Sequence, residues 1–358
     1  MSRQLTIAVS GLNAIDNPGP GVSVLRSLRE SSFKDARLVG LCYSPLEPGV
    51  YMKDLVDVCY EMPYPSEGAD VLWNRLMYIH SKDPIDVIIP NFDSELHPYI
   101  KLQSRLRTEL GIRLVIPTPE QFDMRQKSSL PELGEKAHIA VPSSKNYYSI
   151  DELLMEKEKM EYPLVVKGRY YEASIVYDKE QMYSAFHKIS LSWGFPIIVQ
   201  KYVSGTEYNL IGVGDGRGEL LSAVSMRKMF ITDKGKAWSG ITIDDKPLME
   251  VARRFVAATQ WMGSFELELM KSNDGEYHLL EVNPRIPAWC YLATAAGQNI
   301  PELIVKMALE QEVLPYQSYQ VGKLFIRYSW DMIVDYSDFG TFSVKSELSY
   351  DHEKVNAD

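Results

Sequence analysis

The stretch LLEVNPR, residues 279–285, carries polar side chains at alternate positions of an otherwise apolar segment. In an extended strand every second side chain points to the same face, so Glu281, Asn283 and Arg285 would lie together. A carboxylate, an amide and a guanidinium side by side offer two oxygen ligands and a cation. This spacing favours a site that holds a metal ion together with an anion.

A second alternating segment precedes the first. In FELELM, residues 265–270, Glu266 and Glu268 share the face opposite the apolar side chains. Asp274-Gly275, between the two segments, is a strong signal for a two-residue hairpin turn. The predicted cross-strand pairs are Asn273 with Glu276, Glu268 with Glu281, and Glu266 with Asn283.

Two carboxylates that face each other destabilise a sheet unless a cation lies between them. Oxygen ligands without sulfur or imidazole suit Mg²⁺ or Mn²⁺. The alternative is a solvated sheet face, on which the carboxylates only keep the strands hydrated. With Arg285 on the same face the metal interpretation is favoured, and we predict that Glu268, Glu281 and Asn283 are metal ligands.

Metal sites of this kind usually hold phosphates, so basic residues near strand ends are of interest. Lys167 ends the apolar segment YPLVVK, where it either enters a cleft or protects a sheet edge from pairing. Lys127 lies at the start of a polar helix and Lys201 lies inside IIVQKYV, and neither position is informative by itself. Arg227 and Lys228 end a hairpin strand and must face opposite ways, so we take only Lys228 as a site residue.

The composition is that of an ordinary globular protein, with 45% hydrophobic and 24% charged residues among 358. A formal net charge of -10 argues against nucleic acid or an anionic membrane as the main partner. Three scattered cysteines do not make a disulfide framework or a zinc site, and the six histidines lack metal-ligand spacing. The first residues lack the apolar core of a signal peptide, and no apolar run could span a bilayer. We therefore expect a reduced, cytoplasmic protein.

The common nucleotide-binding loops are missing from the sequence. GVGDGRG, residues 212–218, does not match G-x-G-x-x-G and is typical of a hairpin turn. NPGPG, residues 17–21, follows the first apolar segment but has the wrong glycine spacing for a dinucleotide site. No G-x-x-x-x-G-K-[ST] occurs, which excludes a P-loop NTPase.

The two halves of the chain have different patterns. Apolar strands at residues 5–11, 36–44, 85–90 and 112–117 alternate with helices and predict a parallel α/β sheet for about residues 1–120. Pro117 and Pro119 then mark a boundary. Beyond it, hairpins and helices near 179–190, 246–261 and 299–310 predict an α+β unit, and we expect the tail from Gly322 to be a few strands that close it.

These parts, in this order, resemble the ATP-grasp superfamily, in particular its carbamoyl-phosphate-synthetase-like and biotin-carboxylase-like branch. The resemblance covers most of the chain to about residue 312, and E-x-N-P-R at 281–285 with Glu268 is its most specific piece. It implies an α/β Rossmann-like (pre-ATP-grasp) domain followed by an α+β ATP-grasp fold of two subdomains. The implied units are residues 1–120 (pre-ATP-grasp), 121–205 (lid), 206–315 (metal and substrate binding) and 316–358 (C-terminal strands and tail).

The resemblance also implies roles for individual residues. In that family the positions of Glu268, Glu281 and Asn283 bind two Mg²⁺ ions that bridge the ATP phosphates, and that of Arg285 assists phosphoryl transfer, with Lys228 as a second catalytic candidate. The implied nucleotide contacts are Lys127 and Lys167 for the phosphates, Gln200, Lys201, Tyr202 and Val203 for the adenine hinge, and Glu207 for the ribose or for support of the site.

One segment departs from the family pattern. The family follows the strand lysine with a proline and a glycine-rich flap that covers the phosphates. Here the segment is KGRYYEASIVY, in which Gly168 is the only glycine and Tyr170 and Tyr171 take the place of flexible glycines. Arg169 could compensate as a charge donor. The family's hinge glutamate is replaced by Gln200.

The resemblance implies an ATP-dependent carboxylate–amine ligase that forms an amide or peptide bond through an acyl phosphate, a reaction that needs positioning and charge neutralisation but no side-chain nucleophile. The expected partners are small-molecule carboxylates and amines, amino acids or peptides among them, and a homodimer is compatible with the sequence. The alternatives are a nucleotide-binding scaffold or sensor without turnover, and carboxylation through carboxyphosphate. Trp289 and Tyr291 either line the substrate pocket or pack in the core, and Asp93 and Glu95 either hold a substrate amine or cap a helix.

Overall fold

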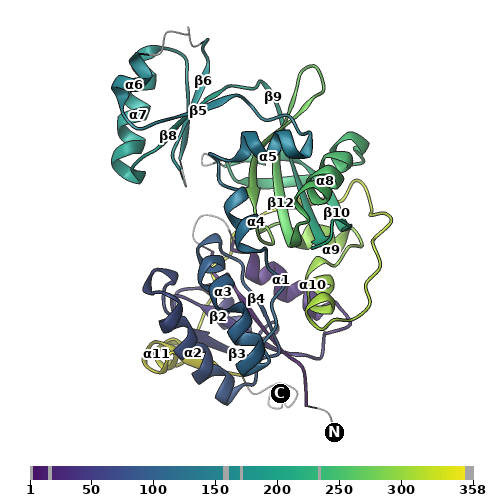
Figure 1. Ribbon diagram of the computed structural model, residues 1–358. Helices are drawn as coiled ribbons and strands as arrows, with labels where there is room; N and C mark the ends of the chain where they lie inside the picture. The colour runs from purple at the N-terminus through teal and green to yellow at the C-terminus, as the bar shows by residue number, and fades with distance from the viewer. Residues whose placement is uncertain (1–2, 15–17, 156–160, 170–171, 233–234, 351–358) are drawn as a thin grey trace.

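The computed structural model describes residues 3–14, 18–155, 161–169, 172–232 and 235–350. Their strands form three sheets of five, six and four strands. The five-stranded sheet lies at the bottom of Figure 1, the six-stranded sheet lies above it, and the four-stranded sheet stands apart at the upper left. Among the described residues, no helix combines the length and the apolar character that crossing a membrane requires.

Four strands of the N-terminal sheet are parallel, as the alternation of strands and helices predicts. Its strands β1 (Thr6–Ser10), β2 (Arg37–Cys42), β3 (Val58–Glu61) and β4 (Val87–Ile89) have the order β3-β2-β1-β4. Helix α1 (Pro20–Arg29) packs on one face, and α2 (Ala69–Lys82) and α3 (Asp93–Arg105) pack on the other. Single helical turns occur at Pro48–Tyr51, Pro65–Glu67 and Leu106–Leu110.

Residues 112–117 do not form the predicted strand. The sheet contains instead β3, which the sequence pattern did not predict. Only an isolated bridge joins Arg113 to Val87. Ile112, Leu114 and Ile116 are nevertheless buried, because they pack into the core under α2 and α3. The apolar pattern of this segment therefore reflects packing and not strand pairing.

The six-stranded sheet is built from long antiparallel strands. In sheet order these are β13 (Tyr277–Asn283), β12 (Met262–Ser272), β9 (Gly205–Asp215), β10 (Leu220–Ile231), β11 (Ala237–Thr242) and β14 (Leu324–Ile326). One face packs on α5 (Leu130–Ala137) and α8 (Lys246–Thr259). The other face joins a core with α1, α9 (Cys290–Ala295) and α10 (Ile300–Ala308), so this core connects the sheet to the N-terminal sheet.

The hairpin of β12 and β13 has the predicted register where the carboxylates lie. Glu268 faces Glu281 and Glu266 faces Asn283. The turn itself differs from the prediction, because the backbone N–H of Ser272 donates to Glu276 (2.9 Å) and leaves a three-residue loop that ends at Gly275, with a φ of 92°. A glycine in the left-handed region is typical of three-residue hairpin loops. A bulge between Glu268 and Leu269 then shifts the register back by one residue.

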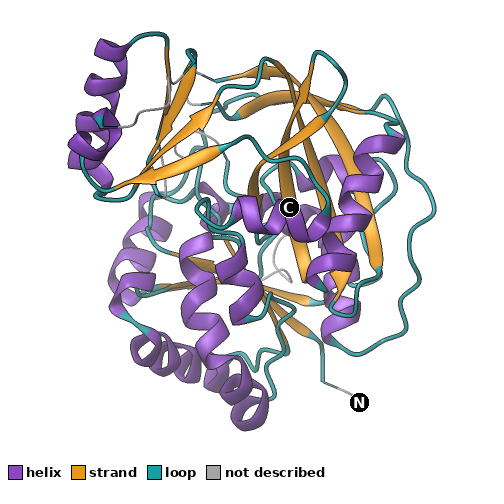
Figure 2. Cartoon of the chain, turned by 45° about the horizontal axis from the view of Figure 1, so that its top comes forward, coloured by secondary structure: helices purple, strands orange, loops and turns teal. Residues whose placement is uncertain are grey.

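The four-stranded sheet is antiparallel and carries its own small core. Its strands, in the order β5 (Ser144–Tyr147), β8 (Ile197–Lys201), β6 (Leu164–Lys167) and β7 (Ala173–Val176), pack on α6 (Ile150–Leu154) and α7 (Lys179–Trp193). Figure 2 shows the two helices on the outer side of this sheet. The preceding α4 (Pro119–Met124) and α5 lie instead with the six-stranded sheet, where Leu130 and Leu133 enter the core under α8.

The C-terminal segment corrects the expectation of a few closing strands. Only β14 joins the six-stranded sheet; the chain then forms helix α11 (Tyr336–Lys345) and strand β15 (Glu347–Ser349). β15 pairs antiparallel with β3 at the edge of the N-terminal sheet. Phe342, fully buried, anchors α11 in the core shared with β1 and β2. The tail therefore adds one edge strand to the six-stranded sheet and one to the N-terminal sheet.

Candidate active site

Four polar side chains meet on the inner face of the six-stranded sheet. The Asn283 amide of β13 donates to Glu266 and to Glu268 of β12, at 3.1 Å each. Glu266 is almost fully buried and also accepts hydrogen bonds from the Asn209 amide (2.7 Å) and the Trp289 indole (2.6 Å). Every hydrogen-bond donor to Glu266 is therefore neutral, and the Arg285 cation acts on this carboxylate only at longer range.

The facing carboxylates Glu268 and Glu281 each have a lysine nearby. The Lys127 ammonium lies 3.6 Å from Glu281, and the Lys228 ammonium lies 3.6 Å from Glu268 and 2.7 Å from Glu207. The lysines come from the segment before α5 and from β10, on different sides of the hairpin. Five of the predicted site residues therefore form one charged cluster.

The pKa shifts follow from burial and from crowding of like charges. Burial raises the pKa of Glu281, with the Glu268 carboxylate adding to the shift and Lys127 opposing it. Burial also raises the pKa of Glu266, again with a contribution from Glu268. Burial alone would lower the pKa of Lys228, but the carboxylates of Glu268 and Glu207 outweigh it and raise that pKa. Repulsion between acidic groups is therefore strong in this cluster, and a bound cation would reduce it.

Lys167 reaches the cluster from the other sheet. It is the last residue of β6, and its pKa is lowered to about 8 by burial and by the Lys127 ammonium, against the opposing effect of Glu281, Glu268 and Glu207. An anion bound beside Lys167 would favour the charged form of this lysine and raise its pKa. The four-stranded and six-stranded sheets therefore bring basic side chains to one location.

Arg285 lies just beyond β13 and contacts the N-terminal unit. Its Nε is 2.9 Å from Asp93, the first residue of α3, and Arg125 lies 3.6 Å from the same carboxylate. Burial alone would lower the pKa of Arg285, but Asp93 and the glutamates of the cluster raise it. Asp93 was expected either to hold a substrate amine or to cap a helix. It does neither, because its carboxylate pairs with Arg285 and Arg125. Glu95 caps α3 through the backbone N–H of Phe92.

The predicted adenine hinge lies where β8 leaves the four-stranded sheet for β9. Gln200 is buried within β8, and Lys201 ends that strand with an exposed side chain. The backbone N–H of Lys201 donates to Ser143 (2.8 Å). Tyr202 and Val203, both half-buried, connect to β9, where Glu207 lies. These residues occupy a connector between two sheets, as a hinge must.

A backbone hydrogen bond links the two described ends of the segment between Lys167 and β7. The backbone N–H of Gly168 donates to Glu172 (3.0 Å), and Glu172 has a φ of 69°. Tyr170 and Tyr171, which replace the family's glycines, lie outside the described residues. The described residues therefore show only the two ends of the predicted flap.

The donor set fits a magnesium ion shared with phosphates. Within the described ranges no three His, Cys, Asp or Glu side chains converge as a ligand set for a metal held by the protein alone. Mg²⁺ is usually held by one or two carboxylates together with substrate phosphates and water. Glu268 and Glu281, opposite each other with the Asn283 amide beside them, supply that number of oxygen ligands.

Several residues of the site were not predicted from the sequence. Glu266 shares the face of Glu268, and that alternation could have identified it. Asn209 faces Glu268 from β9, and Trp289 follows the E-x-N-P-R segment, but their contacts with Glu266 depend on how distant strands pack. Asp93 required knowledge of how the N-terminal unit meets β13.

The part of the chain that carries the glutamates of this cluster matches a known protein family. The family model described as "ATP-grasp in the biosynthetic pathway with Ter operon" matches residues 195–328, which contain the whole six-stranded sheet. The part of the chain that carries these glutamates therefore matches the ATP-grasp superfamily. The ATP-grasp resemblance predicted from E-x-N-P-R and its neighbouring strands is confirmed.

Relatives and solved structures agree with the ATP-grasp assignment. The carbamoyl phosphate synthase large chain of Clostridium beijerinckii is 26% identical over 273 residues, 72% of this chain and 24% of that protein. The chain thus spans about a quarter of the length of that relative. The L-amino acid ligase of Bacillus licheniformis superposes with a TM-score of 0.64 and 16% identity, covering 88% of this chain and 78% of that one.

A third comparison concerns a structure solved with nucleotide. The biotin carboxylase domain of the Hydrogenobacter thermophilus 2-oxoglutarate carboxylase, in complex with MgADP, ADP and bicarbonate, has a TM-score of 0.66 and 15% identity. The alignment covers 89% of this chain and 74% of that domain. At such identities the likeness establishes the ATP-grasp fold alone.

Proposed function

We propose that this ATP-grasp protein is an ATP-dependent carboxylate–amine ligase that forms an amide or peptide bond and uses Mg²⁺. The observation that carries the proposal is the convergence of Glu268 and Glu281 with Lys127, Lys167 and Lys228, from two sheets, around one point. Paired carboxylates among lysines are suited to a metal-bound polyphosphate. The fold shared with an L-amino acid ligase and with an MgADP-bound carboxylase domain supports this assignment.

The residues have distinct tasks in the proposed reaction. Glu268, Glu281 and Asn283 hold Mg²⁺, which neutralises charge on the transferred phosphoryl group. Lys127 and Lys167 neutralise the remaining phosphate charge, and Arg285 and Lys228 stabilise the charge that develops at the γ-phosphate. The hinge residues Gln200, Lys201, Tyr202 and Val203 line the adenine, and Glu207 contacts the ribose or supports Lys228.

The chemistry needs no protein nucleophile. A substrate carboxylate oxygen bonds to the γ-phosphorus as the bond to the β-phosphate oxygen breaks, giving an acyl phosphate and ADP. An amine then bonds to the acyl carbon, phosphate leaves with the C–O electron pair, and the amine loses a proton to water or phosphate. Closure of the four-stranded sheet over the cluster would keep water from the acyl phosphate.

The same proposal covers the organisation of the chain. The N-terminal sheet corresponds to the Rossmann-like pre-ATP-grasp domain, and the four-stranded sheet corresponds to the lid, which in this organisation begins after α5 and not at residue 121. The expected partners are small carboxylates and amines, and a homodimer is compatible with this organisation. A nucleotide sensor without turnover gains no support from the comparisons, whereas carboxylation through carboxyphosphate stays a competitor because a carboxylase domain shares the fold.

Two measurements test the proposal in sequence. Thermal unfolding with ATP should show a stabilisation that requires Mg²⁺, of about 2.7 kcal/mol at a hundredfold excess over Kd. ADP release should then be screened over pairs of carboxylates and amines, with bicarbonate alone as a separate arm. Release that requires both a carboxylate and an amine supports the ligase, and release with bicarbonate alone supports the carboxylase. An ATP effect without any turnover in either arm would contradict both.

A further inference from the structure

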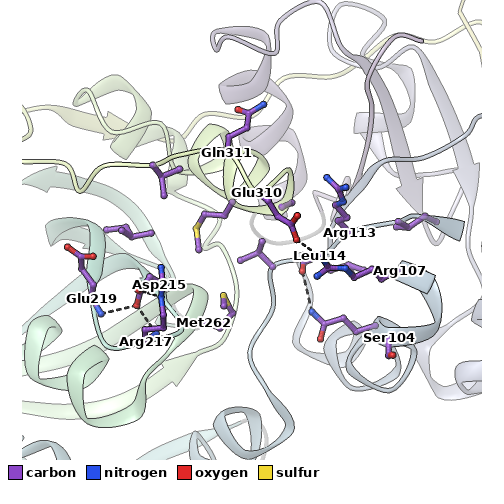
Figure 3. Close-up of a pocket in the computed structure, with 17 residues that line it drawn as sticks. Ser104, Arg107, Arg113, Leu114, Asp215, Arg217, Glu219, Met262, Glu310 and Gln311 are labelled. Atoms are coloured by element: carbon purple, nitrogen blue, oxygen red, sulfur yellow. Dashed lines mark hydrogen bonds and ion pairs between the residues drawn. The ribbon is translucent and has the colours of Figure 1, made fainter. Parts of the chain in front are cut away.

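A pocket of about 570 Å³ lies between the N-terminal unit and the far end of the six-stranded sheet. Figure 3 shows its two walls: Arg107 and Arg113 on one side, and Asp215 and Arg217 on the other, with Glu310 above them. The volume lies within the range of small-molecule sites. None of the residues assigned to the ATP site lines this pocket.

The pocket and the ATP site occupy opposite ends of the same strands. β9 carries Asn209 at the ATP site and ends at Asp215 in the pocket, and β12 begins at Met262 in the pocket and carries Glu268 at the ATP site. Six residues of strand separate the members of each pair, or roughly 20 Å. The two places are therefore distinct cavities of one sheet.

Some charged side chains of the pocket have an ion-pair partner and others do not. Arg107 pairs with Glu310, and Arg217 pairs with Asp215. Arg113 is half-buried, and among the described residues its guanidinium has neither a hydrogen bond nor an ion pair; only its backbone is bonded, to Asp86 and Ile88. Glu219 is also without a side-chain partner in the described structure but is exposed, so water satisfies it. Arg113 is therefore the unpaired cation among the described side chains that line the pocket, and it can pair with a ligand anion.

The floor of the pocket is apolar. Its lining includes the buried side chains of Ile112, Leu114, Leu221 and Ala308, together with the half-buried Val313. The Arg107–Glu310 pair at the mouth is about two-thirds exposed, so it contributes little stability and can open at small cost. A second guanidinium is therefore available to an incoming anion.

We propose that this pocket binds a small organic anion with an apolar body. The carboxylate or phosphate of the ligand pairs with Arg113, whose planar fork suits either group, and Arg107 turns from Glu310 to join it. The apolar body rests on Leu114, Leu221 and Val313. The site does not depend on the ligase assignment, because no residue of the ATP cluster takes part.

Calorimetric titration of the full chain tests this site with four probes. 4-Methylpentanoate and 3-methylbutyl phosphate combine an anion with an apolar body, whereas acetate and inorganic phosphate lack the body. We expect one or both of the larger probes to bind at least tenfold more tightly than the small anion with the same head group. The tighter of the two larger probes identifies a carboxylate or a phosphate ligand. Equal binding of large and small anions would overturn the proposal.

Variants separate the pocket from other anion sites. Arg113→Gln should weaken the tighter probe at least tenfold, and Val313→Trp, which fills the floor without changing a charge, should do the same. Arg253→Gln, an exposed arginine of α8 outside the pocket, is the matched control and should bind normally. Unchanged binding by both pocket variants, or displacement of the probe by MgATP, would show that the anion binds elsewhere. Thermal unfolding of each variant without ligand establishes that it is folded.

Discussion

The guanidinium of Arg285 lies 2.9 Å from the carboxylate of Asp93, so the arginine that follows β13 is held by a helix of the N-terminal unit. Both side chains are more than three-quarters buried, at 22% and 24% exposure. The same arginine also interacts electrostatically with Glu266, Glu268 and Glu281. The N-terminal unit therefore helps to position a proposed catalytic cation, in addition to any contact with substrate.

Replacing Asp93 with asparagine should destabilise the fold and impair turnover together. Loss of one member of a buried ion pair costs several kcal/mol, and partial exposure reduces the expected loss of unfolding free energy to about 1–3 kcal/mol. Urea unfolding measures it. Asp70→Asn, at the corresponding exposed first turn of α2, is the control and should change stability by less than about 0.5 kcal/mol. Similar values for both variants would mean that the Asp93–Arg285 pair contributes nothing.

Glu281→Gln should abolish the Mg²⁺-dependent effect of ATP on thermal unfolding and leave the fold intact. The substitution removes a metal ligand but also relieves repulsion from Glu268, which is worth about 0.2–1 kcal/mol in a sheet. Glu276→Gln, directly after the loop of the same hairpin and exposed, should respond to MgATP like the parent. Normal MgATP binding by Glu281→Gln would exclude this strand as a metal site.

ATP affinity should fall as the pH rises through about 8. Below that pH Lys167 is charged and ready for a phosphate; above it the free protein holds a neutral amine and must take up a proton to bind. The expected slope approaches tenfold in Kd per pH unit above 8. Lys167→Arg, which stays charged, should remove the slope. A flat profile between pH 7 and 9.5 in the parent would contradict the role of Lys167.

The same shift predicts how stability without ligand depends on pH. The folded pKa of Lys167 is about 8 and its unperturbed value is 10.5, so the unfolded chain binds more protons between these values. The Lys167 contribution to the unfolding free energy should therefore rise from pH 8 to about 10.5. Comparison of the parent with Lys167→Gln isolates this contribution from other titrating groups.

Trp289→Phe should destabilise the protein through Glu266. The indole N–H is one of three side-chain donors to a buried carboxylate, and its loss should cost about 1–3 kcal/mol of unfolding free energy. In a Glu266→Gln background the same substitution should cost less, since the charge is gone. Trp330→Phe, at an exposed tryptophan, is the control. Equal costs in both backgrounds would assign the effect to packing.

The carboxylate hairpin could be predicted because two local signals agree. Alternation of polar and apolar residues at 265–270 identifies the face of Glu268, and the turn signal at Asp274-Gly275 identifies its partner, Glu281. The loop length could not be read from these signals, and the predicted Asn273–Glu276 pair is wrong. A bulge compensates for the longer loop, so the register of the carboxylates is right although the turn is not.

Features that depend on distant contacts were not predictable. The segment 112–117 is as apolar as a strand but packs without a ladder. Residues 336–345 contain a glycine and several β-branched and aromatic residues, which are weak helix formers, and only Phe342 is buried. The partner of Arg285 comes from the N-terminal unit, and the partners of Glu266 include Trp289, beyond the next strand; no local sequence pattern predicts either contact.

The pairing of β15 with β3 has a consequence for how the chain folds during synthesis. A strand at residues 347–349 completes a sheet whose other members all lie before residue 90, and two further sheets are made between them. On the ribosome, the first sheet therefore has an unpaired edge until residues 347–349 have emerged. Such late, non-local closure is slow and exposes a strand edge to other chains. A chaperone that shields the edge of β3 would act between the synthesis of β3 and the synthesis of β15.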